Sequence, residues 1–137
     1  MYSEKDIIDF VINKAAVKPE EVNLDTDIFG ELGSTGDDFH ELIGEYATKY
    51  SVDMNNYLWY FHADEEGMSF GSVFFPPPFK RVKRIPVTPR MLLSFANSGK
   101  WQIGYPPHKI PKHRIDIYIN YLILTVVLFF VIKSCIN

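Results

Sequence analysis

An apolar run near the C-terminus limits what the whole chain can become. From Ile115 to Ile132 the sequence reads IDIYINYLILTVVLFFVI, and only Asp116, Asn120 and Thr125 interrupt its apolar character. As a helix, eighteen residues span ~27 Å, close to the ~30 Å hydrocarbon core of a bilayer. From Tyr121 onward apolar residues occupy every face, and a chain of 137 residues has little means to bury such a helix all round. We therefore expect a transmembrane helix over residues 115–132; the alternative is a buried C-terminal helix or strand.

The residues that flank this run predict its orientation. Three basic residues, Lys109, Lys112 and Arg114, precede it, whereas only Lys133 follows it. Because the side richer in Lys and Arg stays in the cytoplasm, the body of the protein is expected there. Residues 133–137 then form a short tail on the far side.

The charges of the chain are divided unevenly between its two halves. Residues 1–70 hold sixteen Asp and Glu against four Lys, a net charge of −12, and residues 71–137 hold ten Lys and Arg against one Asp, a net charge of +9. An acidic half favours a basic protein surface as partner, and a basic half beside an apolar tail favours anionic lipid. Mutual attraction of the two halves is the alternative.

The chemistry-bearing residues argue against an enzyme. One cysteine, Cys135, allows neither an internal disulfide nor a thiolate metal cluster. The adjacent pairs Asp37–Asp38 and Glu65–Glu66 do not face one another on a helix, and no Gly-rich phosphate loop is present. The four histidines are scattered along the chain: His40, His62, His108 and His113. We expect no catalytic residue and no metal site.

Three helices are predicted before the membrane segment. Ser3 and Asp6 have the spacing of a capping box at the start of a helix over residues 4–16. A second helix should run over about 37–50, opened after Gly36 and capped by Asp37 or Asp38. A third begins with Thr88 as cap and Pro89 at its first position, and Gly99 ends it.

Apolar spacing on these helices predicts the core. On the second helix apolar residues follow one another at i, i+3, i+4, i+7, i+8 and i+11, which places them in one stripe along the helix. The predicted core consists of Phe39, Leu42, Ile43 and Tyr46, packed with Ile8, Val11, Ile12, Leu92 and Phe95.

Residues 57–85 are rich in aromatic residues and proline, and we interpret them as an irregular insertion. The three consecutive prolines 76–78 predict an extended, polyproline-like chain, and the aromatic residues 55–61 predict a strand or short turn. The basic residues beside the phenylalanines suggest contact with an anionic membrane surface. These membrane-surface candidates are Lys80, Arg81, Lys83 and Arg84, with Lys109, Lys112 and Arg114 nearer the span. A solvated loop or lid is the alternative; nucleic acid is not expected, because the acidic half would repel phosphates.

One short motif carries a family resemblance. The stretch from Leu32 to Asp38 resembles the Leu-Gly-x-Asp-Ser-Leu signature of acyl carrier proteins, with Thr35 in place of the aspartate and Gly36 in place of the serine. In that family the serine opens the second helix and carries the phosphopantetheine arm. Together with Thr-Pro-x-Met-Leu from Thr88 and Gly-Lys-Trp from Gly99, the pattern resembles a family of small, uncharacterised bacterial acyl-carrier-like proteins.

The resemblance implies a fold and a domain organisation. It implies a mainly α protein, an acyl-carrier-like helical bundle over residues 1–104 interrupted by the insertion at about 57–85. A Pro-rich basic linker over 105–114 would join this bundle to the single transmembrane helix. For a bacterial protein the membrane would be the inner membrane.

The resemblance also implies a function. Gly36 offers no hydroxyl, so we expect no phosphopantetheine and no other cofactor. In carrier proteins the acidic face of the second helix is bound by basic patches of fatty-acid or polyketide-type enzymes and of transferases, and here that face carries Asp37, Asp38, Glu41 and Glu45. The expected function is a membrane-anchored, non-catalytic interaction or regulatory module. The alternatives are a true acyl or peptidyl carrier modified at Ser34 or Thr35, and a small inner-membrane immunity or regulatory protein.

Overall fold

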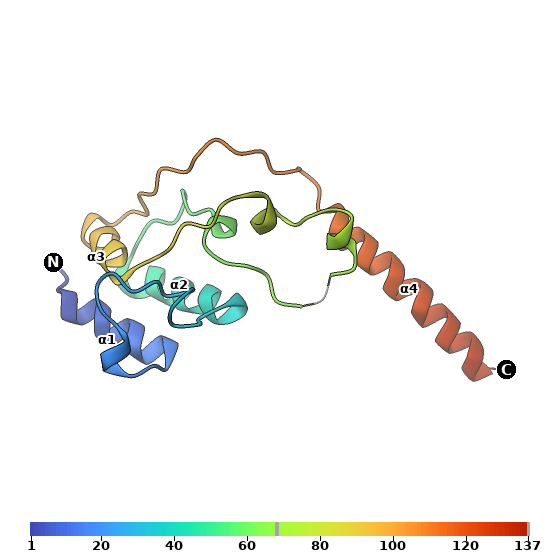
Figure 1. Cartoon of the computed structure of the whole chain (residues 1–137), viewed down its shortest axis with the longest axis horizontal. Helices are drawn as coiled ribbons and strands as arrows, with labels where there is room; N and C mark the ends of the chain where they lie inside the picture. The colour runs from blue at the N-terminus through green and yellow to red at the C-terminus, as the bar shows by residue number, and fades with distance from the viewer. Residues whose placement is uncertain (68, 137) are drawn as a thin grey trace.

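The protein is mainly helical, with three helices gathered at one end and a long fourth helix projecting from the other (Figure 1). The computed structural model describes residues 1–67 and 69–136, so Met68 of the insertion and Asn137 of the tail lie outside the described residues. The α-helices are α1 (Glu4–Ala15), α2 (Gly36–Tyr50), α3 (Pro89–Ser98) and α4 (Ile115–Ile136). Four 3-10 turns join them: η1 (Pro19–Glu21), η2 (Trp59–Phe61), η3 (Gly71–Val73) and η4 (Pro78–Arg81).

The ends of α1 and α3 confirm the predicted caps. Ser3 accepts a hydrogen bond from the Asp6 N–H while the Asp6 carboxylate accepts one from the Ser3 N–H, which completes the capping box. Thr88 accepts a bond from the Met91 N–H, and α3 ends at Gly99 in the left-handed conformation, with a φ of 71°. These local signals therefore act as the sequence indicates.

The start of α2 corrects one prediction. The cap position is Thr35, and the helix begins at Gly36, so Asp37 and Asp38 lie in the first turn and neither caps it. Gly36 has a φ of 52°, a value that favours glycine, and this allows the chain to turn into the helix one residue earlier than expected. The two carboxylates still lie at the positive end of the helix.

The core of the body follows the predicted stripe of α2. Phe39, Leu42, Ile43 and Tyr46 are all buried. On α1 the prediction is confirmed in part: Ile8 and Ile12 pack against the core, but they are only half-buried and lie at its edge. The face of α1 that is turned inward is centred on Val11, as predicted, together with Ile7 and Phe10, which were not predicted. These three residues are spaced i, i+3 and i+4, so they share one side of the helix.

The insertion contributes to the core instead of lying outside it. Phe61, His62 and Ala63 are buried, and the fully buried Trp101 packs edge-on against Tyr57. Residues 59–61 form a 3-10 turn, and among the described residues there is no strand beyond an isolated bridge between Asp53 and Lys100. The extended proline segment ends early, since Pro78 already begins η4.

The base of α4 is attached to the insertion, and the remainder of the helix is free of the body. Turn η3 packs against the first turns of α4, as Figure 1 shows. From Tyr121 to Ile136 every residue of α4 is exposed. A helix of this length without protein cover matches a bilayer better than water.

Candidate functional site at the start of α2

Residues 27–35, which we call the signature loop, lead into and include the start of the stretch that resembles the carrier signature. This loop is closed by backbone hydrogen bonds. The Ile28 N–H donates to the Val87 carbonyl at 3.0 Å, and the Ser34 N–H donates to the Ile28 carbonyl at 3.4 Å. Ile28 is fully buried and anchors the loop in the core. The signature therefore leads directly into α2 at Gly36.

Gly36 is covered by the insertion. Its N–H donates to the Asp64 carboxylate at 3.2 Å, and a Cβ built on Gly36 would overlap the side chain of Glu66. In the resemblance this is the position of the arm-bearing serine. A side chain here would need a left-handed backbone conformation and displacement of Glu66.

The two nearby hydroxyl groups are placed differently. Ser34 is buried, with 6% of its surface exposed, and Thr35 is half-buried at the cap position without a side-chain capping bond. A group transfer to Ser34 would first require the signature loop to open.

A cleft of about 480 Å³ lies beside this position, between the start of α2 and the base of α4. Carboxylates from three segments line it: Asp37 from α2, Glu65 and Glu66 from the insertion, and Asp116 from α4. The other lining residues are His40, Gly67, Ser69, Ser72, Pro77, Phe79, Lys80, Arg114, Ile117 and Asn120. The sequence predicts only Asp37, Lys80 and Arg114 of this set as site residues, and it does not predict that they meet.

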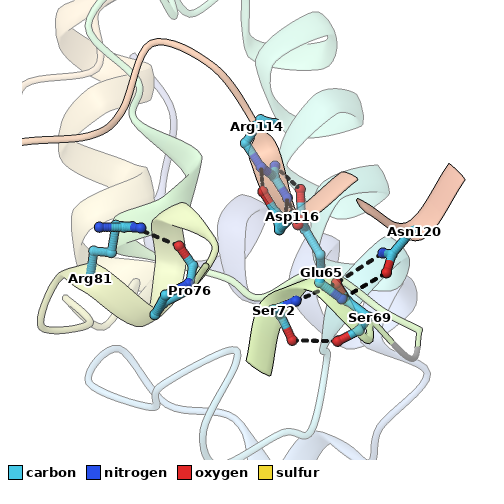
Figure 2. A network of polar contacts seen from close by, with 9 residues as sticks. Glu65, Ser69, Ser72, Pro76, Arg81, Arg114, Asp116 and Asn120 are labelled. Carbon is cyan, nitrogen blue, oxygen red and sulfur yellow. Dashed lines mark hydrogen bonds and ion pairs between the residues drawn. The ribbon is translucent and has the colours of Figure 1, made fainter. Parts of the chain in front are cut away.

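Arg114, which lines the cleft, joins the insertion to α4 (Figure 2). Its guanidinium donates to both oxygens of Glu65, each at 2.8 Å, and to Asp116 at 3.0 and 2.6 Å. Hydrogen bonds to Asp116 and Glu65 raise the pKa of Arg114 above its ordinary value. The residue was predicted as a membrane-surface cation, but its charge is already matched by two carboxylates.

The acidic residues of α2 lie along the solvent side of the helix. Asp37, Asp38 and Glu41 are exposed. Glu45 is half-buried and forms an ion pair with Lys14 of α1. Three of the four predicted partner-binding residues are thus accessible, and the fourth is paired within the body.

The basic residues after the prolines do not share one role. Arg84 donates to both carboxylate oxygens of Asp27, at 3.1 and 2.6 Å, and lies 5.1 Å from the centre of the Phe29 ring, so it secures the signature loop. Arg81 donates to the Pro76 carbonyl at 2.6 Å. Lys80 lies at the cleft, and the remaining predicted cations, Lys83, Lys109 and Lys112, are exposed.

A buried polar network holds the insertion to the segment that follows α3. His62 contacts the Ile85 carbonyl through Nδ1 at 2.9 Å and the Tyr105 hydroxyl through Nε2 at 2.8 Å. The same hydroxyl accepts a bond from Trp101 Nε1 at 2.9 Å. Burial lowers the pKa of His62 to about 4, so the imidazole is neutral at pH 7. No motif in the sequence points to this network.

The described residues offer neither a metal centre nor a second long apolar helix. In the part of the chain that the structure describes, no group of three His, Cys, Asp or Glu side chains could hold a metal ion. Within the same residues, α4 is the one helix that is long and apolar enough to cross a membrane.

Comparison with known proteins gives a family and no function. No curated protein and no solved structure matches the chain. A family model described as "Protein of unknown function (DUF1493)" matches residues 3–103, which include α1, the signature loop, α2, the insertion and α3. The chain therefore belongs to the DUF1493 family.

Proposed function

We propose that this protein is a membrane-anchored, acyl-carrier-like module that binds a protein partner through the acidic side of α2 and carries no phosphopantetheine. The observation behind the proposal is the contrast at the start of α2. There the modification position is a covered glycine, whereas Asp37, Asp38 and Glu41 beside it are exposed. A module of this kind keeps the docking surface of a carrier without its chemistry.

The electrostatics of this surface favour a basic partner. The three carboxylates lie on the first two turns of one helix, close enough to act on the same patch of a partner. Exposed charges of one sign mainly steer association and select partners by charge. The partner class that the resemblance suggests is an enzyme or transferase of fatty-acid or polyketide type.

The carrier alternative is less well supported. A hydroxyl that accepts phosphopantetheine must reach the bound coenzyme within the narrow geometry of group transfer. Ser34 is buried, and Thr35 is half-buried at the helix cap. The third alternative, an immunity or regulatory protein, has no specific observation in its favour.

Anchoring and orientation complete the proposal. We propose that α4 spans the bacterial inner membrane and that the body lies in the cytoplasm, because Lys109, Lys112 and Arg114 precede the helix and Lys133 follows it. A reporter fused to the C-terminus should be active only when it is of a type that functions outside the cytoplasm. Activity of a strictly cytoplasmic reporter at this end would contradict the orientation.

Photo-crosslinking in intact cells tests the partner site. Gly44 lies on α2 three residues after Glu41 and is exposed, and a Cβ built there meets no other side chain. A photo-reactive residue there should give a discrete adduct, and the double substitution Asp38→Lys with Glu41→Lys should remove it. A photo-reactive residue at the exposed Ser94 of α3 serves as the positional control.

The charge control uses acidic residues away from α2. Asp9 and Glu20 are exposed on α1 and η1, and their double substitution to lysine changes the net charge by the same amount. The adduct should persist in that variant. An adduct that survives reversal of Asp38 and Glu41, or that disappears equally in both double variants, would overturn the proposed site.

A further inference from the structure

Turn η3 and the residues that flank it expose an unusual number of apolar side chains. The exposed fractions are 59% for Phe70, 76% for Val73 and 74% for Phe74, and Phe75 follows at 39%. Contiguous exposed apolar groups on a small protein mark a surface that contacts a partner or a membrane. We call residues Ser69–Phe75 the foot.

The foot is fastened to the base of α4 by specific contacts (Figure 2). The Gly71 N–H donates to the Asn120 side-chain carbonyl at 2.9 Å, and the Asn120 amide donates to the Ser69 hydroxyl at 2.9 Å. A Cβ at Gly71 would overlap the carbonyl oxygen of Asp116, so glycine permits this close approach. The foot is therefore held at a fixed position along the axis of α4, beside Asp116 and Asn120.

This position, at the first turns of α4, is where the membrane interface is expected. Asp116 and Asn120, the two α4 residues that the foot contacts, are separated by ~6 Å along the axis. Tyr118 and Tyr121 lie in the same turns and are exposed, as residues of an interfacial aromatic belt are. Phe70 and Phe74 come from a segment about fifty residues earlier in the chain, and they place two more exposed aromatic rings near the same interface.

The backbone N–H groups of the foot are paired within the protein, as a site with little water requires of them. All five N–H groups from Gly71 to Phe75 are hydrogen-bonded, the first to Asn120 and the other four to carbonyls of Ser69, Phe70 and Gly71. An unpaired N–H would make insertion among lipids costly. This segment has already met that requirement.

We propose that the foot inserts into the cytoplasmic leaflet beside α4 and forms a second attachment of the body to the bilayer. The inference rests on the proposed anchoring of α4. The foot is expected to contact lipid, because its apolar side chains extend the apolar surface of α4 at the N-terminal end of that helix. Exposed Lys112, three residues before α4, and exposed Lys80, at the cleft beside the base of α4, supply positive charge that anionic head groups attract.

Two attachments would do what one helix cannot. A single span allows the body to rotate and tilt about its linker, whereas a foot at a second point restricts both motions. The cleft lies between α2 and the base of α4, so its distance from the head groups would then be set by the foot. The acidic side of α2 would be presented to partners at a constant orientation.

Depth-dependent quenching tests the inference on the full chain. Cys135 is the one cysteine, so Cys135→Ser provides a cysteine-free background. Single variants Val73→Cys, Phe74→Cys, Val127→Cys and Asn56→Cys are labelled with an environment-sensitive fluorophore. They are reconstituted in vesicles of phosphatidylethanolamine and phosphatidylglycerol that contain lipid spin-labelled either near the top or near the end of its acyl chain. Aqueous iodide is used in parallel as a quencher that reports exposure to water.

The four positions separate the foot from the anchor. We expect lipid quenching at residues 73 and 74 within about twofold of each other and clearly above that at residue 56, since interfacial groups lie ~5–10 Å into the boundary. Quenching of the label at residue 127, in the middle of α4, by lipid spin-labelled near the end of its acyl chain establishes the span. If the label at residue 127 is quenched by lipid while the labels at residues 73 and 74 are quenched only by aqueous iodide, insertion of the foot is disproved and the membrane span of α4 is retained. If residue 127 is not quenched either, both proposals fall.

Discussion

The helical body and the base of α4 are held together by different forces. In the body, α1, α2 and α3 meet through a continuous apolar core of residues such as Leu42, Phe39 and Leu92. At the base of α4 the contacts are polar: Arg114 joins Glu65 to Asp116, and Asn120 joins Ser69 to Gly71. Apolar packing depends on volume, whereas these polar contacts depend on exact donors and acceptors. The two regions should therefore respond to different substitutions.

The largest expected effect is on the core of the body. Leu42→Ala should lower the free energy of unfolding by ~2–5 kcal/mol, because Leu42 is only 2% exposed and truncation leaves a cavity. Chemical denaturation of the full chain in detergent measures it. Glu41→Ala, one residue earlier and exposed, should change stability by less than about 0.5 kcal/mol. Equal effects would mean that α2 is placed wrongly.

Acid should weaken the junction between body and insertion. The pKa of His62 is lowered to about 4 from the ordinary 6.5, so the unfolded chain binds a proton at a higher pH than the folded chain does. The contribution of neutral His62 to the free energy of unfolding is fully present above about pH 6.5, and it is lost as the pH falls toward 4. At pH 5 the loss should be about 2 kcal/mol.

Urea denaturation at pH 7 and pH 5 checks this pH dependence. The His62→Gln variant should be less stable than the parent protein at pH 7. Its free energy of unfolding should change much less between pH 7 and pH 5 than that of the parent, because the group that titrates is absent. His113→Gln, at an exposed position, should keep the pH response of the parent protein. A parent protein whose stability is the same at both pH values would contradict the neutral, buried state of His62.

Loss of Arg114 should open the base of α4 and leave the body intact. Arg114→Ala leaves Glu65 and Asp116 without their shared partner, at a local cost of ~1–3 kcal/mol. Hydrogen exchange should then rise by about tenfold or more over residues 69–75, with α2 unchanged. Arg90→Ala removes a bidentate pair with the exposed Asp25 and serves as the matched control. Uniform acceleration of exchange over the whole chain would contradict the separation of the two regions.

The smallest expected effect is on covalent modification. Gly36→Ser should remain without phosphopantetheine when it is co-expressed with a broad-specificity transferase, because Glu66 covers the position. It should also be destabilised by ~1 kcal/mol through the left-handed backbone. Intact-mass measurement of the co-expressed protein shows whether a phosphopantetheine unit has been added. Addition of one phosphopantetheine unit to Gly36→Ser would show that the cover is loose, and addition to the natural protein, lost in Ser34→Ala, would favour the carrier alternative.

Much of the body can be predicted because its signals are local. The capping box of Ser3 and Asp6, the Thr88–Pro89 start of α3 and the stripe of α2 each lie within one or two helical turns. Ile8 and Ile12 show the limit of this reasoning. A periodic pattern shows which residues share a face, whereas the centre of the buried face depends on where α2 and α3 pack against it.

The sequence by itself determined the helices of the body, the absence of a hydroxyl at Gly36, and one helix long and apolar enough to cross a membrane, since composition and short-range spacing are sufficient for each. The tertiary structure alone decided that Glu66 covers Gly36, that His62 lies in a buried network, and that Asn120 fastens a foot to α4. These contacts join residues roughly thirty to fifty positions apart through segments without a periodic pattern. Such pairs form only when the body has folded and places an irregular segment beside its partner.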